Sequence, residues 1–175
     1  MVFRKRRAKQ MPTDKINLTP KITQTGPFKG RKPLLEVQIN GIKIYTKKNS
    51  MVVHDDFRSP RCPVCGKYKH QWPAQNANSV AFEKTTKARV AALLPDDYAM
   101  PDKPVTLCWD AVLSYRPRRI DISNVIAALD DAFAGTAFAD DDWSRVKSHR
   151  GSRIGYDKDN PHIVLRMYAY DPKQD

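Results

Sequence analysis

The sequence predicts a mixed α/β fold of the α+β kind, in which a mixed β-sheet carries two main helices. The clearest helix is expected from residue 121 until Gly135, because apolar side chains recur there at helical spacing. The clearest strand is expected over residues 105–115, where apolar side chains alternate along the chain. A second alternating segment, 162–170, is expected to close the sheet. The apolar positions of the helix are Ile122, Val125, Ile126, Leu129 and Phe133.

Shorter patterns predict the remaining elements. Residues 34–46 predict a β-hairpin, because two alternating segments flank Asn40-Gly41, the dipeptide preferred in two-residue type I′ turns. The other expected elements are a strand at 51–53 that extends the same sheet, a helix at 78–94, a strand at 144–148 and a polar loop at 149–161.

Length and composition favour one folded domain with extensions. A chain of 175 residues suits a single ordinary domain and is short for two. We expect the domain over residues 34–175, preceded by a basic flexible tail over residues 1–33 that has few large apolar side chains to bury. The sequence lacks an apolar stretch for a membrane span, a signal peptide and a convincing disulfide set. These features predict a cytoplasmic protein that does not associate with membranes.

Positive charge is concentrated in the first 50 residues. They hold 13 lysines and arginines against Asp14 and Glu36, which gives +11 of the chain's net +12. Phosphate contacts by such a segment add salt-sensitive affinity that is independent of base sequence, so we expect it to bind nucleic acid. The alternative is a solvated tail that only aids solubility. The densest basic run is Arg4, Lys5, Arg6 and Arg7.

Acidic residues gather at two places around the helix expected from residue 121. Asp121, Ser123 and Asn124 occupy its first turn, where each is a good N-cap type and a carboxylate suits the positive end of the helix dipole. Helix capping alone is therefore one interpretation of Asp121. The helix would be about 20 Å long, so Asp140–Asp142 can approach Asp121 only if the chain turns back after Gly135. Phe138 and Trp143 are candidates to anchor that return.

Converging carboxylates would suit metal and phosphate chemistry. They repel one another unless a cation lies between them, and hard oxygen ligands select Mg²⁺ or Mn²⁺. Such a cation polarises a phosphodiester and generates hydroxide at neutral pH. Arg116, Arg118 and Arg119 precede Asp121, and their planar guanidinium groups match phosphate oxygens. Lys84 and Lys87 can line a DNA face of the helix at 78–94, with a solvated basic face as the alternative.

A second metal site is indicated within residues 54–72. Cys62-Pro-Val-Cys65-Gly resembles a zinc knuckle, in which a tight turn aims two thiolates at one ion. His54 and His70 are candidates for the other two ligands of a structural Zn²⁺. A metal-free loop is the alternative. Cys108 lies in the apolar strand at 105–115 and is expected to be a buried core thiol.

Three motifs, RRIDISN (118–124), LDDAF (129–133) and FADDDWSRV (138–146), resemble the RusA-type Holliday junction resolvases of bacteria, prophages and phages. The resemblance covers about residues 80–170. The first aspartate of the family's D-x-D-N motif falls on Asp121, and its late essential aspartate falls on Asp142, with Asp141 beside it. The second aspartate of the motif falls on Ser123, and a lysine one turn into the helix falls on Ala127. The chain therefore departs from the family pattern at two positions.

The resemblance implies a Mg²⁺-dependent endodeoxyribonuclease that hydrolyses phosphodiesters of four-way DNA junctions during recombination and repair. It further implies a homodimer with its two metal sites on opposite strands of the junction, in a bacterial cell and encoded by the bacterium, a prophage or a phage. Asp121 and Asp142 would hold the metal, and Asp141 and Ser123 would assist. Arg118 and Arg119 would position phosphate.

Two alternatives remain from the sequence. In the first, the departures at Ser123 and Ala127 mark an impaired site, and the chain binds DNA junctions through its basic tail and zinc insert without cutting them. In the second, the chain is a small basic protein of a ribonucleoprotein particle. The second alternative does not explain why acidic residues cluster near a phosphate-binding site, so we rank it last.

Overall fold

The computed structural model describes residues 13–46, 51–55, 60–65, 71–116, 121–142 and 144–175, and the side chains of 51–55 and 71–75 are not included in that description. The chain is a mixed α+β protein that divides into two compact units. The first comprises Met1–Lys43, Lys103–Arg116 and Val146–Asp175, and the second comprises Ile44–Asp102 and Pro117–Arg145. None of the described helices is long and apolar enough to cross a membrane.

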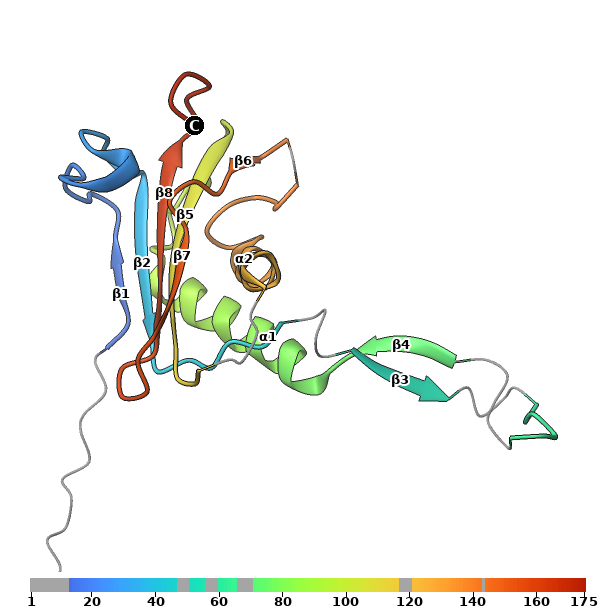
Figure 1. The fold of residues 1–175 in the computed structure, drawn as a ribbon. Coiled ribbons are helices and arrows are strands. Elements are labelled where there is room, and N and C mark those ends of the chain that lie inside the picture. Colours follow the sequence, from blue (N-terminus) through green and yellow to red (C-terminus); the bar gives the residue numbers. More distant parts are fainter. Residues whose placement is uncertain (1–12, 47–50, 56–59, 66–70, 117–120, 143) are drawn as a thin grey trace, which may run out of the picture. The chain divides into compact units, whose positions relative to one another are not determined.

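A six-stranded mixed sheet forms the first unit (Figure 1). Its strand order is β1-β2-β8-β5-β6, and β7 also pairs with β5. The pairs β1/β2, β2/β8 and β8/β5 are antiparallel, whereas β6 and β7 both run parallel to β5. The strands are β1 (Lys15–Asn17), β2 (Leu35–Asn40), β5 (Val105–Leu113), β6 (Val146–Ser148), β7 (Arg153–Tyr156) and β8 (His162–Ala169).

Cross-strand register gathers the apolar side chains of three central strands on one face of this sheet. Val37 lies opposite Leu165, and Leu165 lies opposite Trp109 on its other side. Because side chains alternate between faces along a strand, every second residue before and after these positions joins the same face. Nine residues of this face are buried: Leu35, Val37, Ile39, Leu107, Trp109, Ala111, Ile163, Leu165 and Met167. The strands predicted at 105–115 and 162–170 are thereby confirmed.

The opposite face of the sheet is covered in part by the segment before β2. The short 3-10 helix η1 (Gly26–Phe28) places the Phe28 ring on that of Tyr168, with centroids 4.1 Å apart and planes 7° from parallel. The Tyr168 hydroxyl shares a 2.8 Å hydrogen bond with Thr23. Gly151 approaches so closely that a Cβ there would lie 2.8 Å from Pro27. The prediction of a flexible tail up to residue 33 is therefore wrong for residues 13–33, because β1 and Phe28 give this segment a strand partner and a buried anchor.

The predicted hairpin over residues 34–46 does not form. Both edges of β2 are occupied, one by β1 and the other by β8, so the chain after Gly41 has no free edge of β2 to pair with. Asn40 has no positive φ and therefore does not adopt the type I′ turn. Its side chain instead donates to the Thr13 carbonyl at 2.7 Å, and its backbone N–H donates to Asp14 Oδ1 at 2.9 Å. The Asn40-Gly41 dipeptide thus ends a strand that pairs elsewhere.

The second unit contains α1 (Ala77–Leu93), α2 (Ile122–Phe133) and a separate two-stranded sheet of β3 (Met51–Asp55) and β4 (Gln71–Gln75). The prediction that residues 51–53 extend the main sheet is wrong, because β3 pairs only with β4 within the described residues. The two helices lie against each other in this unit. Asn76 caps α1 by accepting a 2.8 Å hydrogen bond from the Asn78 N–H. The helix at 78–94 is confirmed. Its buried residues are Ser79, Phe82, Thr86 and Val90, two of which are polar.

A compact turn follows α2 and brings the chain back. Gly135 has φ +75°, a conformation that favours glycine, and its N–H donates to the Phe138 carbonyl. Phe138 is fully buried, as expected for an anchor of the return, and Trp143 lies outside the described residues. The Tyr98 hydroxyl donates to the Ala137 carbonyl at 2.7 Å, and burial raises its pKa to about 12. This tyrosine stays protonated and holds the turn in place.

The predicted polar loop at 149–161 contains an unexpected strand. Residues of β7 pair with β5 in parallel, with Asp110 opposite Arg153 and Leu113 opposite Tyr156. The Arg153 guanidinium reaches the Asp110 carboxylate at 2.5 Å. The glycines and charged residues of this segment concealed the strand, because β7 lies on the exposed edge of the sheet and buries no side chain fully.

Candidate metal and nucleic-acid site

Asp121 is the N-cap of α2, as its residue type predicted. Its Oδ1 atom accepts hydrogen bonds from the Ser123 N–H at 2.9 Å and from the Ser123 hydroxyl at 2.6 Å. Both side chains are exposed. Ser123 therefore binds the Asp121 carboxylate and orients it. Asn124 follows with a buried Oδ1 atom that has no hydrogen-bond partner among the described residues.

Asp142 repeats this arrangement after the turn. Its Oδ1 atom accepts from the Ser144 N–H at 2.7 Å, the Ser144 hydroxyl at 2.6 Å and the Arg145 N–H at 3.1 Å. The Ser144 hydroxyl is the main cause that lowers the pKa of Asp142, and the backbone donors add to it. The carboxylate is exposed and fully ionised at neutral pH, which is the form that binds a cation.

Asp141 has different neighbours. Burial raises its pKa, and a hydrogen bond with Asp140 and the negative charges of Asp131 and Asp130 raise it further. Asp130 and Asp131 belong to the last turn of α2, about 15 Å along the helix axis from its N-cap. The pKa of Asp141 is therefore raised in part by the acids at the C-terminal end of α2.

The shared metal site of Asp121 and Asp142 stays a prediction. Within the described ranges, no group of three His, Cys, Asp or Glu side chains is placed so that it can hold a metal ion. The structure shows two separately oriented, exposed carboxylates and a group of acids beside Asp141. Ala127, where the resemblance would place a lysine, is exposed and adds no charge.

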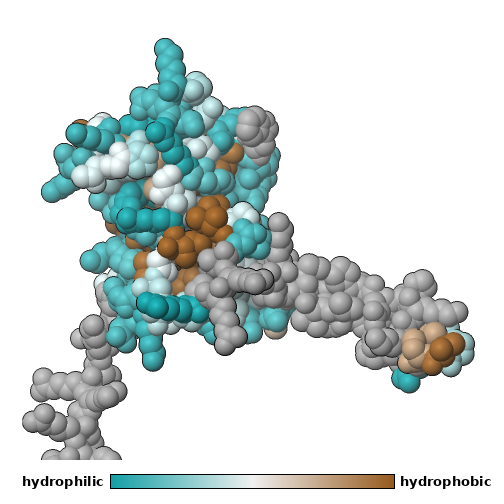
Figure 2. Space-filling model, in the orientation of Figure 1, coloured by the Kyte–Doolittle hydropathy of each residue, from teal (hydrophilic) through white to brown (hydrophobic). Residues whose placement is uncertain are grey.

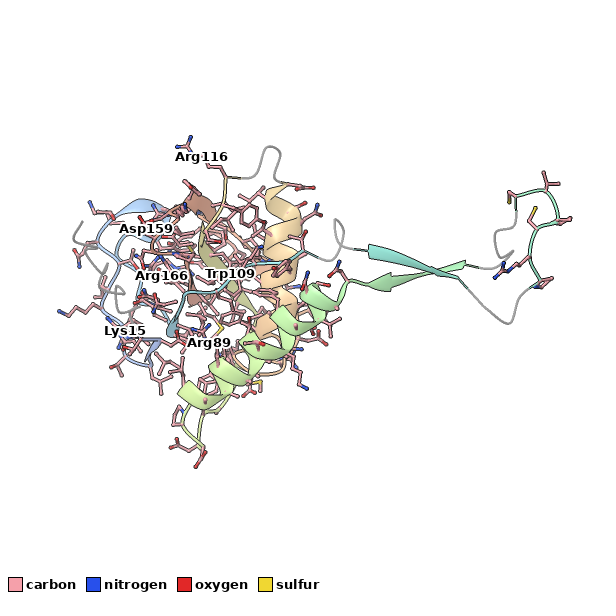
Figure 3. The ribbon with its side chains drawn as sticks, turned by 90° about the horizontal axis from the view of Figure 1, so that it is seen from below. Lys15, Arg89, Trp109, Arg116, Asp159 and Arg166 are labelled. Carbon is pink, nitrogen blue, oxygen red and sulfur yellow. The ribbon has the colours of Figure 1, made fainter. Side chains whose placement is uncertain are left out.

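The predicted phosphate-binding residues are described in part. Arg116 is exposed at the end of β5, and Figure 3 shows its side chain well away from Trp109 and Arg166 in the body of the sheet. Lys84 is exposed on α1, whereas Lys87 is half-buried and pairs with Glu83 at 3.0 Å. Arg118, Arg119 and the run Arg4, Lys5, Arg6 and Arg7 lie outside the described residues.

The Cys62–Cys65 turn has the local geometry of a thiolate site. The backbone N–H groups of Cys65 and Val64 point at the Cys62 sulfur and lower the pKa of that thiol, and the Cys65 thiol also contributes. Val64 at the tip of the turn is 92% exposed, and Figure 2 shows hydrophobic colouring in the described part of the loop between β3 and β4. The side chain of His54 and the whole of His70 lie outside the description. Cys108 is a buried thiol of the sheet, as predicted.

A cavity of about 560 Å³ lies in the first unit between the sheet and the segment before β2. Four of its charged lining residues form two ion pairs, Arg166 with Glu36 at 2.7 Å and Arg153 with Asp110, and Lys21 also lines it. None of the predicted site residues lines it.

Sequence reasoning did not single out Lys43, Tyr115 or Tyr156. In the structure, the Arg116 guanidinium lies over the Tyr156 ring and the Lys43 ammonium lies over the Tyr115 ring. A tyrosine next to an arginine, Tyr115-Arg116, was the signal in the sequence for this group. The pairing of β7 with β5 is what brings Tyr156 to the same end of the sheet.

Neither the models of known protein families nor the curated proteins match this chain.

Proposed function

We propose that the chain is a Mg²⁺- or Mn²⁺-dependent endodeoxyribonuclease that cuts branched DNA such as four-way junctions, in the manner of the RusA-type resolvases that its motifs resemble. The single observation that carries the proposal is the matched setting of Asp121 and Asp142. Each is exposed and each has one carboxylate oxygen fixed by a serine two residues later. These are the two residues at which the motif places the metal ligands.

The donor set suits magnesium. Carboxylate and amide oxygens are hard ligands, and Mg²⁺ is usually held by one or two carboxylates together with waters and substrate phosphates. Asp121 and Asp142 would hold the ion, and Asp141 would assist through a bound water. When bound, the ion would polarise the phosphodiester and supply hydroxide. Ser123 keeps the Asp121 carboxylate oriented, and the Arg116 guanidinium, with Arg118 and Arg119, would bind phosphate oxygens.

The proposal extends to a structural Zn²⁺ bound by Cys62 and Cys65. Two backbone N–H donors aimed at one sulfur stabilise a thiolate, the form that binds zinc. A two-stranded sheet such as β3–β4 is marginal by itself, and a metal in its connecting loop would close that loop. His54 and His70 are the proposed remaining ligands. We further propose a location in the bacterial cytoplasm and, on the resemblance alone, a homodimer.

The test is cleavage of a synthetic four-way junction and a linear duplex of the same sequences, each with and without Mg²⁺. Paired, symmetric nicks on the junction that disappear with a chelator are the expected result. Cutting that persists in the chelator, or equal cutting of the linear duplex, would contradict the proposal.

One observation favours a second candidate, a junction-binding protein without catalysis. The Ser123 hydroxyl donates to Asp121 at the position where the family has another acid, so the first turn of α2 offers one carboxylate in place of two. This candidate predicts tight junction binding and no cutting in either Mg²⁺ or Mn²⁺.

A further inference from the structure

Two exposed tyrosines lie at one end of the six-stranded sheet. Tyr156 is the last residue of β7, and Tyr115 follows β5 by two residues. Because β7 runs parallel to β5, with Tyr156 opposite Leu113, the segments that follow these two strands leave the sheet at the same end. The Asp157 N–H donates to the Leu113 carbonyl at 3.0 Å and fixes this pairing beyond the last strand residue. Tyr115 and Tyr156 are 39% and 42% exposed.

Each ring has a cation over it. The Arg116 guanidinium carbon lies 5.3 Å from the centroid of Tyr156, and the Lys43 ammonium lies 6.0 Å from the centroid of Tyr115. Such pairs are weak at exposed sites, so a ligand that offers both an aromatic face and an anion can rearrange them at little cost. Asp157, the residue after Tyr156, accepts hydrogen bonds at its Oδ1 atom from the Asp159 and Asn160 N–H groups. With two rings and two cations, the surface formed by Lys43, Tyr115, Arg116 and Tyr156 is aromatic and basic, and Asp157 beside Tyr156 adds one negative charge.

Unpaired nucleotides have the chemistry that this surface fits. A base presents a flat π face for a tyrosine ring, and the phosphates beside it present charge for lysine and arginine. Bases inside a duplex are already stacked on their neighbours and do not offer that face. Bases at a branch point, a gap or a single-stranded end do offer it.

We propose that Tyr115 and Tyr156 stack on unpaired bases of DNA, while Lys43 and Arg116 contact the adjoining phosphates. The inference rests on the proposed function in taking DNA as the ligand, and it adds the part of the DNA that the first unit recognises. Through it, the chain would prefer open, branched DNA to continuous duplex before any bond is cut.

The test measures binding in the absence of Mg²⁺, with a single strand, a duplex and a four-way junction that carries 2-aminopurine at its branch point. The Tyr115→Ala/Tyr156→Ala double variant is expected to lose about tenfold or more in affinity for the single strand. It is also expected to lose the quenching of 2-aminopurine fluorescence. Tyr115→Phe/Tyr156→Phe keeps the rings and should bind like the wild type. Leu34→Ala, which shortens another exposed apolar side chain of this unit, is the matched control.

The outcomes separate this inference from the nuclease. Unchanged affinity and quenching in the alanine double variant, with junction cleavage retained in the wild type, would overturn the stacking surface and leave the nuclease standing. Ring-dependent binding with no cleavage in Mg²⁺ would support the surface and remove the nuclease. A wild type that binds none of the three DNAs would overturn both. Thermal melting of each variant shows that a lost signal does not come from unfolding.

Discussion

Ser144 donates two hydrogen bonds to one oxygen of Asp142, from its N–H at 2.7 Å and from its hydroxyl at 2.6 Å. Ser123 makes the same pair of contacts with Asp121. An exposed aspartate normally samples several rotamers, and these contacts restrict both carboxylates before a ligand arrives. The repeated Asp-x-Ser arrangement therefore orients both carboxylates of the proposed metal site.

Asp142→Asn should lower junction cleavage by about 100-fold or more and leave junction binding nearly unchanged. Asparagine keeps the size and an acceptor oxygen but removes the charge that would hold the ion, and the metal stabilises the transition state by several kcal/mol. Single-turnover cleavage and a binding titration measure the two effects. Asp140→Asn, which removes a neighbouring exposed charge, is the matched control and should cut normally. Retained cleavage in Asp142→Asn would remove this residue from the site.

Ser123→Asp should restore a carboxylate at the first turn of α2 and lower the Mg²⁺ concentration for half-maximal cleavage, on the order of tenfold. A negative charge there also suits the positive end of the helix dipole, so the variant should fold normally. A magnesium titration of the cleavage rate checks this. Ser144→Asp adds the same charge beside Asp142, outside the D-x-D-N motif, and should give no such gain. An unchanged or higher magnesium requirement in Ser123→Asp would indicate that position 123 does not face the metal.

Asp141→Asn and Asp142→Asn should change stability in opposite directions at neutral pH. The pKa of Asp141 is raised on folding, so its ionised form opposes folding above its ordinary pKa of 3.8, and Asp141→Asn should be more stable than the wild type. The pKa of Asp142 is lowered, so its charge contributes stability above 3.8 that is lost as the pH falls through its folded-state pKa. Denaturant midpoints between pH 3 and pH 7 measure both. Differences of equal sign at neutral pH, or an Asp141→Asn difference that persists at pH 3, would contradict the assigned directions.

The purified protein should contain one zinc ion per chain, which elemental analysis measures. Cys62→Ser and Cys65→Ser should each lose it, because a thiolate ligand is removed from a four-coordinate site. Cys108→Ala should keep it, since that thiol is buried in the sheet and burial raises its pKa. Loss in His54→Ala and His70→Ala would identify the remaining ligands. A zinc-free protein whose Cys62 and Cys65 react freely with a thiol reagent would contradict the site.

Neutralising Arg4, Lys5, Arg6 and Arg7 to glutamine should weaken DNA binding at low salt and flatten its salt dependence. Each lost phosphate contact lowers the slope of log affinity against log salt by about 0.9, so the largest expected change is about 3.6. The substitutions keep the length of the chain, so any change in binding comes from the lost charge and not from a shorter chain. An unchanged slope would mean that this run does not contact DNA.

Much of the fold was predictable where one pattern had one meaning. The stripe of Val125, Leu129 and Phe133 could only be the buried side of a helix, and the acid before it could cap that helix. The alternation along β5 and β8 was equally clear. In α1 the pattern was ambiguous, because small and polar residues such as Ser79 and Thr86 are buried while Val80 remains exposed. Periodicity places an element but cannot choose its buried face when apolar residues do not mark it.

The errors came from pairing between distant segments. Asn40-Gly41 has strong local turn chemistry, yet β8 lies more than 120 residues further along the chain and occupies the edge of β2 that the predicted hairpin needed. Tyr115 and Tyr156 likewise lie at the same end of the sheet only because β7 pairs with β5. Local sequence gives preferences for turns and strands, and the choice of partner depends on burial over the whole sheet. The chemistry of Asp121 and Asp142 was visible in the sequence, whereas the serine contacts that orient them were not.

The pairing of β1 with β2 has a consequence for how the basic N-terminus would act. Residues 15–17 attach the chain to the edge of the sheet, and Arg4 precedes residue 13 by nine residues, so the basic run is tethered within about 30 Å of residue 13. Once DNA is held by the first unit, each further contact is therefore an intramolecular step at high effective concentration. A separately added peptide of the same sequence would have to overcome dilution and should bind far more weakly.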